Sequence, residues 1–289
     1  MAAPAPARRS ASSLYTWGAV ALVVIVIAVF VVIKVTKPAA APVADTVASA
    51  QMLAEITAPN MTVANTVGTT SPSAPVSALT YVPGQPPLRL NGKPDVLYVG
   101  AEFCPYCAAE RWALAVALGR FGTFSNLGLT YSADSPEVYP RTATLTFLHT
   151  TYTSPYLTFE SVETQDRVHK TLQVMTARQN LVFSKYDVNQ YLPANQPGYG
   201  GSIPFLDINN QYFQAGANYS PGILNGMTHQ GVASGLGSAG SPVTAAIVAT
   251  ANIITADICV ATHQLPHAIC TAPGVKAGAK AQSLLNAQG

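Results

Sequence analysis

The sequence predicts a mixed α/β domain that follows one N-terminal membrane-spanning helix. Three features of the 289-residue chain carry this prediction. An uncharged apolar run fills residues 14–33. A β-favouring run at 95–101 leads into two closely spaced cysteines and then into helical spacing. A segment at 202–221 has the pattern of a strand, a turn and a returning strand.

Composition excludes several classes of protein. Charged residues make up 10% of the chain, hydrophobic residues 49%, and the formal net charge is +2. The 15 lysines and arginines are scattered, so we predict no nucleic-acid partner. Four cysteines are too few for a disulfide scaffold, and a hydrophobic core must therefore supply most of the stability.

The apolar run at 14–33 is 20 residues long, about what a helix needs to cross the hydrocarbon core of a bilayer. Tyr15 and Trp17 stand at its start, where amphipathic aromatic side chains favour the interface. A cleaved signal peptide is the alternative, but the run is longer than a signal core. Two basic residues flank each side, and the free amino group adds to the first side. We predict a single-pass membrane protein whose main domain is extracytoplasmic.

The remaining composition sets the expected domain boundaries. We predict a short N-terminal tail at 1–13, the transmembrane helix at 14–33, an Ala/Pro/Thr-rich linker at 34–80, one folded domain at 81–275 and a flexible tail at 276–289. Within the linker, one patch at 45–56 has the pattern of a short amphipathic helix.

The two cysteines lie at a junction between a strand and a helix. The run before them is apolar without interruption, which fits a strand buried on both faces. From Pro105 to Phe121 the apolar residues recur every three or four positions, as in a helix. Cys104 is therefore expected at the helix N-terminus and Cys107 in the first turn.

This position suits redox chemistry. A helix N-terminus favours the thiolate form of cysteine, so we predict that Cys104 is the nucleophile and Cys107 the resolving thiol. Pro105 fits the first helical position, where its missing N–H loses no bond. Tyr106 is expected at the surface, where it would tune access. An inert structural disulfide and a metal site are the alternatives, although zinc would want four ligands and there is no second Cys-x-x-Cys.

The segment "DVLYVGAEFCPYC", the segment "SIPF" and the hairpin followed by a helix resemble the thioredoxin superfamily. The resemblance implies that the Ile203–Pro204 bond is cis and faces the cysteines. Ile203 and Pro204 would then dock the substrate chain, with Pro105 and Tyr106 beside them. A plain strand-opening proline is the alternative.

The wider block from Leu97 to Leu127 resembles the DUF929-type family of membrane-anchored, thioredoxin-like proteins, over roughly residues 76–270. This resemblance implies the fold and the redox pair but no substrate. The spacing from Cys104 to Pro204 is similar to that of periplasmic disulfide-bond oxidoreductases, and implies an insertion between the cysteine helix and the cis-proline strand. The chain departs from thioredoxin in having Phe103 before the motif and no buried acid within "VLYVG", and Glu102 is the nearest carboxylate to the motif.

Other elements are expected from their patterns. We predict two extended pieces within 143–163, a helix at 164–186 and a long Ala-rich helix from 242 to about 263 that packs inside the protein. On the cysteine helix, Trp112 falls on the apolar face and is expected in the core, whereas Glu110 and Arg111 are expected to be solvated.

The second cysteine pair, in "CVATHQLPHAIC", is expected to form a structural disulfide between Cys259 and Cys270. The alternatives are a metal site that also uses His263 and His267, and two unpaired thiols. A disulfide would fit an extracytoplasmic location, because the cytosol keeps thiols reduced.

The predicted function is a membrane-anchored, extracytoplasmic thiol–disulfide oxidoreductase whose redox-active pair Cys104–Cys107 needs no cofactor. Its partners would be protein thiols and disulfides, a redox partner that recycles the pair, and the membrane through residues 14–33. The alternatives are a binding or assembly module with a static disulfide and, third, a metal-delivery protein.

Overall fold

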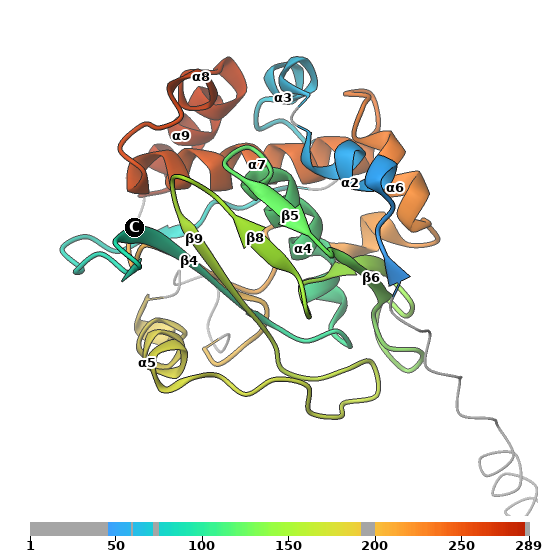
Figure 1. Ribbon diagram of the computed structural model, residues 1–289. Coiled ribbons are helices and arrows are strands. Elements are labelled where there is room, and N and C mark those ends of the chain that lie inside the picture. Colours follow the sequence, from blue (N-terminus) through green and yellow to red (C-terminus); the bar gives the residue numbers. More distant parts are fainter. Residues whose placement is uncertain (1–45, 59, 72–74, 192–199, 287–289) are drawn as a thin grey trace, which may run out of the picture. The chain divides into compact units, whose positions relative to one another are not determined.

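The computed structural model describes residues 46–58, 60–71, 75–191 and 200–286. The predicted tail at 1–13 and the predicted membrane helix at 14–33 lie outside the described residues. All described residues fall in the second of the two units into which the chain divides, Asp45–Gly289. The second unit (Figure 1) is a mixed α/β domain and contains both cysteine pairs.

A six-stranded mixed sheet forms the centre of this unit. Its longest strand, β4 (Lys93–Gly100), runs parallel to β9 (Thr158–Glu163) on one side and antiparallel to β10 (Phe205–Ile208) on the other. The sheet continues from β10 to β11 (Tyr212–Ala215) and β2 (Thr80–Tyr81), and β3 (Arg89–Leu90) pairs with the start of β4.

Both faces of β4 are covered, which explains its unbroken apolar sequence. Val96 and Tyr98 point into the larger core, and Leu97 and Val99 point into a smaller core on the opposite face. This alternation is the two-residue period of a strand. In Figure 1, α4 (Pro105–Leu118) and α7 (Pro242–Ala261) lie on one side of the sheet and α5 (Ala177–Tyr186) on the other. The prediction of a strand buried on both faces is confirmed.

The hairpin of β10 and β11 turns where it was predicted. Asn209 and Asn210 have φ angles of 58° and 57°, the left-handed conformation that a two-residue hairpin turn requires and that asparagine tolerates. After the hairpin come the short helices η2 (Pro221–Leu224) and α6 (His229–Gly235).

Helix α7 is the one helix among the described residues that is long and apolar enough to cross a membrane, yet 89% of its apolar window is buried inside the protein. Its polar residues have internal roles: the Asn252 side chain donates to the carbonyls of Ala64 (2.9 Å) and Gly68 (2.6 Å). It is a core helix, as its polar residues predicted.

The residues between α4 and β9 hold four short strands. In this segment β6 (Gly128–Tyr131) and β7 (Ala143–Thr146) form a small sheet, and β5 (Thr123–Ser125) pairs with β8 (Thr151–Thr153). The predicted extended region at 143–163 thus contains three strands, β7, β8 and β9, where two were expected.

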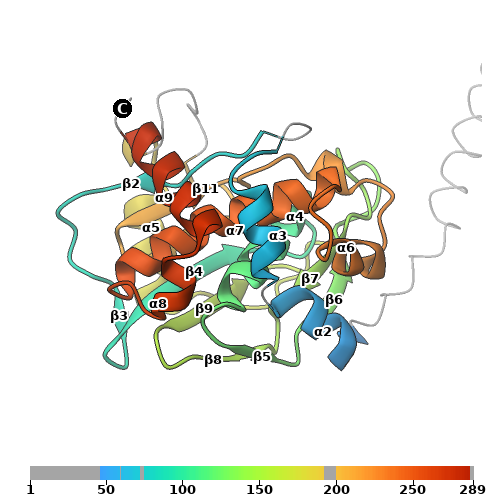
Figure 2. The same cartoon turned by 90° about the horizontal axis from the view of Figure 1, so that it is seen from above.

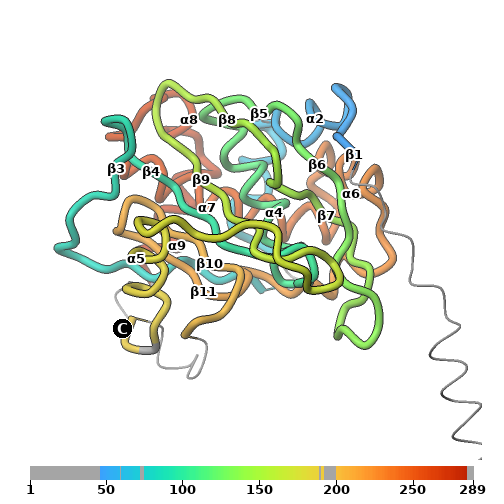
Figure 3. The backbone as a smooth tube through the Cα atoms, turned by 60° about the horizontal axis from the view of Figure 1, so that its bottom comes forward, coloured from blue at the N-terminus to red at the C-terminus, as the bar shows by residue number. Residues whose placement is uncertain are grey.

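The predicted helix at 164–186 is mostly irregular chain. Only α5 is helical there, and Thr176 caps it with a reciprocal capping box to Gln179. The preceding residues, yellow-green in Figure 3, cross the front of the molecule in that view. A 3-10 helix, η1 (Asn189–Tyr191), follows α5.

The described part of the predicted linker is folded. The short helix expected within 45–56 is present, but the expectation of a loose linker for the remainder was wrong. β1 (Thr46–Val47) pairs with β6 and completes its sheet, and α2 (Ala50–Thr57) and α3 (Met61–Val67) pack on the domain. Ser49 and Asn60 cap the two helices, whose buried residues include Ile56 at 2% exposure. Apolar residues at helical spacing outweighed the loop-like composition.

The expected flexible tail is likewise helical in its described part. α9 (Pro273–Asn286) packs along α7 and against α3, because Gly278 lets its backbone approach that of α7 closely and Gly274 lets it approach the backbone of Ala64 in α3. A Cβ at Gly278 would lie 2.4 Å from the carbonyl oxygen of Asn252. The domain therefore extends beyond the predicted boundary at residue 275.

Cys259, near the end of α7, forms a disulfide with Cys270, the last residue of α8 (His267–Cys270), as predicted. Their Cα atoms are 5.6 Å apart and 11 positions separate them in sequence. We expect a Cys259→Ala/Cys270→Ala variant to lose about 3 kcal/mol of unfolding free energy, because the bond limits the entropy of a loop of this length in the unfolded chain. Urea unfolding measures the loss. A loss below about 1 kcal/mol would show that the packing of α8, and not the disulfide, holds this segment in place.

Candidate active site at the N-terminus of α4

Cys104 is the N-cap residue of α4. Its Sγ accepts a hydrogen bond from the backbone N–H of Cys107 at 3.3 Å, and Pro105 occupies the first turn as predicted. Cys104 is 6% exposed and Cys107 is fully buried, and no disulfide joins them. The more accessible sulfur is therefore the one at the helix N-terminus.

The start of the β10 strand meets this sulfur. The Ile203–Pro204 peptide bond is cis, as predicted, and the Cys104 Sγ lies 3.8 Å from the carbonyl oxygen of Ile203. Gly216, at the end of the hairpin, donates to the Pro204 carbonyl at 2.7 Å and holds this segment to its neighbour. Two chain segments 99 positions apart thus share one site.

The two thiols have different acidities. The pKa of Cys104 lies below that of an ordinary thiol, because the Cys107 side chain and backbone N–H hydrogen-bond to its sulfur and Arg111 adds positive charge. The pKa of Cys107 is raised well above its usual value, first by burial and then by the neighbouring Cys104. Of the two thiols, Cys104 is therefore the one that ionises more readily, while Cys107 holds its proton more tightly.

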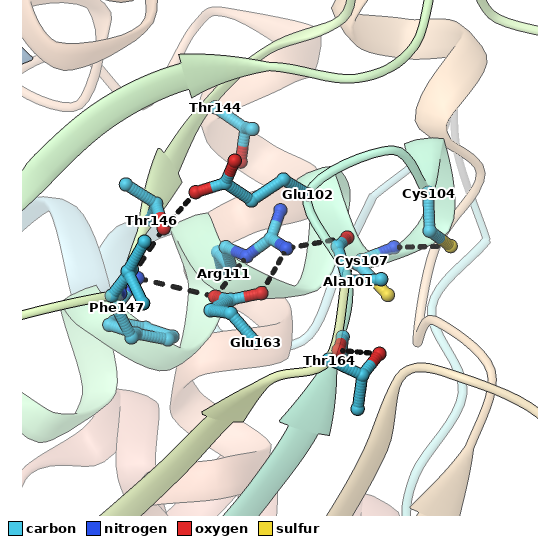
Figure 4. Close-up of polar contacts among 12 residues, drawn as sticks. Ala101, Glu102, Cys104, Cys107, Arg111, Thr144, Thr146, Phe147, Glu163 and Thr164 are labelled. Atoms are coloured by element: carbon cyan, nitrogen blue, oxygen red, sulfur yellow. Dashed lines mark hydrogen bonds and ion pairs between the residues drawn. The ribbon is translucent and has the colours of Figure 1, made fainter. Parts of the chain in front are cut away.

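A buried ion pair lies in the turn after Cys107 (Figure 4). The Arg111 guanidinium donates to both Glu163 oxygens, from Nε at 2.9 Å and from Nη2 at 2.6 Å. Nη2 also donates to the carbonyl of Ala101 at 2.7 Å, and both side chains are 0% exposed. The expectation that Arg111 is solvated was wrong, because β9 and the segment between α4 and β9 cover the polar side of α4.

Glu163 is the site residue that sequence reasoning missed. It ends β9 opposite Gly100 of β4, and it also accepts a hydrogen bond from the backbone N–H of Phe147 at 3.2 Å. The buried carboxylate near the cysteines therefore comes from the neighbouring strand. The available signal was an arginine on a helix that is otherwise apolar, since such a charge needs a buried partner.

Glu102, which precedes the motif, is also buried. It is 2% exposed and accepts a hydrogen bond from the Thr146 hydroxyl at 2.7 Å (Figure 4). The small sheet of β6 and β7 covers it. This bond ties the loop before Cys104 to β7.

Aromatic side chains surround the cysteines. Tyr106 is 42% exposed, as predicted, and its ring lies 6.3 Å from that of Tyr139. On the other side, Phe103 contacts the ring of His169 at 4.1 Å. Trp112 is fully buried, as predicted, and its indole N–H donates to the Ala143 carbonyl at 3.0 Å. A groove of about 290 Å³ begins at Tyr106 and includes Ser77 and Tyr219.

Glu110 is buried as well, against expectation, and joins α4 to the groove. Its Oε2 accepts from the backbone N–H of Asn218 at 3.0 Å, while Oε1 has no hydrogen-bond partner. Burial raises the pKa of Glu110 to about 7.

Because the pKa of Glu110 is raised in the folded protein, the free energy of unfolding is expected to fall as the pH rises. The unfolded chain releases the Glu110 proton near pH 4.5, while the folded chain holds it to about pH 7, so stability falls across that window. Urea unfolding gives the free energy of unfolding of Glu110→Gln relative to that of the wild type. We expect this difference to shift by about 3 kcal/mol in favour of the variant between pH 4 and pH 8. An unchanged difference across that range would contradict the buried carboxyl.

Metal ligation has no support in the described residues. Within the described ranges, no group of three or more His, Cys, Asp or Glu side chains could hold a metal ion. The sulfurs of Cys259 and Cys270 are taken by their disulfide, which rules out the metal alternative that included His263 and His267.

Comparison with known proteins gives one match. A family model described as a domain of unknown function (DUF929) matches residues 82–260. The matched segment runs from the strand before the cysteines, through the cis-proline hairpin, to the end of α7. Neither a curated protein nor a solved structure matches the chain.

Proposed function

The chain belongs to the DUF929 family, whose description states no function, and from its cysteine site we propose that it is a thiol–disulfide oxidoreductase. The observation that carries the proposal is the setting of Cys104. Its sulfur caps a helix, accepts the N–H of Cys107 and lies 3.8 Å from the Ile203 carbonyl. A low-pKa sulfur beside a buried second thiol is what exchange with an external disulfide requires.

We further propose that the fold is thioredoxin-like, with an insertion after the cysteine helix. Support comes from the order of the elements. Strand β4, helix α4, parallel strand β9 and helix α5 are followed by the antiparallel hairpin β10–β11, and the cis-proline of that hairpin faces the cysteines. The insertion at 119–157 contributes strands, and it buries Arg111 and Glu102.

The reaction balances within the pair and one substrate disulfide. The Cys104 thiolate attacks a substrate sulfur, a Cys104–substrate S–S bond forms, and the other substrate sulfur leaves as a thiolate. Cys107 then gives up its proton and attacks Cys104, which releases the second substrate sulfur. The pair is left oxidised and the substrate has gained two electrons. In the reverse direction the same steps oxidise a substrate dithiol, and the reduction potential of the pair decides the direction.

Protein chains are the proposed substrates. An extended backbone can pair with the backbone of Ile203 beside Cys104, and the groove at Tyr106 can receive a side chain. The loops that border the cysteines also carry exposed apolar side chains, Val138 at 72% and Val168 at 77%. A protein dithiol or disulfide of the same compartment would recycle the pair.

The proposed location is the outer side of a membrane, with residues 14–33 as the anchor. The Cys259–Cys270 disulfide supports an oxidising compartment. Labelling intact cells with a membrane-impermeant maleimide tests it. Val174 is 83% exposed, so a Val174→Cys chain that lacks Cys104 and Cys107 should react from outside. Protection until the cells are lysed would overturn the location.

Redox titration tests the function itself. The full-length protein is equilibrated in glutathione buffers, and the oxidised fraction of the Cys104–Cys107 pair is followed by mass. We expect a potential between about −120 and −270 mV together with turnover of insulin disulfides or reduced ribonuclease. A potential below about −300 mV with no turnover would instead identify a static disulfide.

A further inference from the structure

Arg120, two residues beyond the last residue of α4, is a buried cation whose charge no carboxylate neutralises. It is 6% exposed, and among the described residues no acidic side chain forms an ion pair with it. Both of its hydrogen bonds leave from Nη1, to the Thr255 hydroxyl at 2.7 Å and to the Ala251 carbonyl at 3.3 Å. The buried Nε has no partner.

The charge on Arg120 persists at neutral pH. Burial lowers its pKa only to about 10, so the guanidinium stays protonated. Arg111 shows the usual solution, in which a buried guanidinium binds a carboxylate through two N–H groups. The edge of Arg120 formed by Nε and Nη2 is the one through which Arg111 holds Glu163, and no acceptor among the described residues binds it.

This side chain lines a cavity of about 270 Å³. The cavity is bordered by α2, α3, α6 and α7, which lie next to one another in Figure 2. Its inner wall is apolar, from Ile56, Val63, Val116, Leu236 and Val248, and its exposed rim includes Asn60 and Ser234. A cationic group beside an apolar wall can orient a ligand that has one anionic end and an apolar body.

A carboxylate at the cavity limits the negative charge that a ligand can carry. Glu55 also lines the cavity, and its carboxylate accepts hydrogen bonds from Gln51 at 3.1 Å and from Gln230 of α6 at 2.8 Å. This negative charge disfavours ligands with two negative charges, such as phosphate monoesters or dicarboxylates. The cavity therefore suits a ligand with a single negative charge and an apolar body. Its one carboxylate would bind Arg120, and its short apolar chain would lie along Ile56 and Val248.

We propose that this cavity is a binding site for a small monocarboxylate with a short apolar chain, held through the free edge of Arg120. The site is separate from the cysteines, because α4 has 14 residues and places about 20 Å between its two ends. The proposal does not depend on the proposed redox function. Its failure would leave that function untouched.

Calorimetric titration of the full-length protein with 3-methylbutanoate tests the site. We expect a dissociation constant of about 1 mM or lower. The neutral isostere 3-methylbutanamide should bind about tenfold more weakly or worse, because it cannot form charge-assisted bonds with Arg120. Equal binding of the acid and the amide, no binding of the acid at this concentration, or equally tight binding of inorganic phosphate would each overturn the proposal.

Three variants separate binding from folding. Arg120→Met and Arg120→Lys should each weaken 3-methylbutanoate binding about tenfold or more, since neither keeps the two-pronged edge. Ser234→Trp leaves Arg120 intact and should block the rim, whereas Ser238→Trp, exposed and outside the cavity lining, should bind as the wild type does. Unchanged binding in Ser234→Trp would overturn the site even if Arg120→Met failed to fold.

Discussion

Replacing Cys107 with serine is expected to leave Cys104 covalently joined to substrate proteins. The nucleophile still attacks, but no second thiol is present to open the mixed disulfide. Full-length Cys107→Ser chains, recovered under acid quench and run without reductant, should show adducts that disappear on reduction. Cys104→Ser chains should show none, because the buried Cys107 is fully enclosed and its pKa is raised.

Cys104→Ser should also lower disulfide turnover by roughly 10³-fold or more, as loss of a nucleophile does elsewhere. Serine is a good N-cap residue and can accept the same N–H of Cys107, so α4 is expected to keep its start. The matched control is Cys259→Ser/Cys270→Ser, which removes the other cysteine pair and should keep turnover. Adducts in Cys104→Ser, or turnover within tenfold of the wild type, would place the nucleophile elsewhere.

The parts of the site that local sequence patterns specify were predictable. A strand with apolar residues on both faces, a proline after Cys104 and helical spacing beyond it describe one continuous segment, and the structure has it at Lys93–Leu118. The hairpin at Asn209 and Asn210 follows from residues that tolerate positive φ. The encounter of Cys104 with Ile203 depended on a family resemblance, since nothing local links residues 99 positions apart.

The parts that depend on tertiary packing were not predictable. Arg111 was expected in solvent because charged residues on helices usually are, and its partner Glu163 lies 52 positions away on another strand. The irregular chain before α5 was expected to be helical because its composition allows a helix, but it crosses the edge of the site instead. The linker and tail boundaries were wrong because short helices outside the expected domain are stabilised by packing on it, which their composition did not reveal.

Arg111→Met is expected to destabilise the domain by about 3–5 kcal/mol, because it leaves the Glu163 carboxylate buried without a counter-charge. The pKa of Cys104 should rise at the same time, since Arg111 is one of the groups that lower it. Urea unfolding measures the first effect. The pH dependence of Cys104 alkylation by iodoacetamide in the reduced protein measures the second, and Cys107 should stay unreactive because it is buried.

A second substitution shows whether charge or packing is responsible. Arg111→Met/Glu163→Gln removes both charges, while the glutamine oxygen can still accept the N–H of Phe147. We expect the double variant to recover at least half of the lost stability, because the penalty comes from an unpaired buried charge. Arg141→Met, which removes an exposed pair with Asp134, should cost less than about 1 kcal/mol. If the double variant were no more stable than Arg111→Met, the arginine would act through its packing and its bond to Ala101, and the pair would not be an electrostatic element of the site.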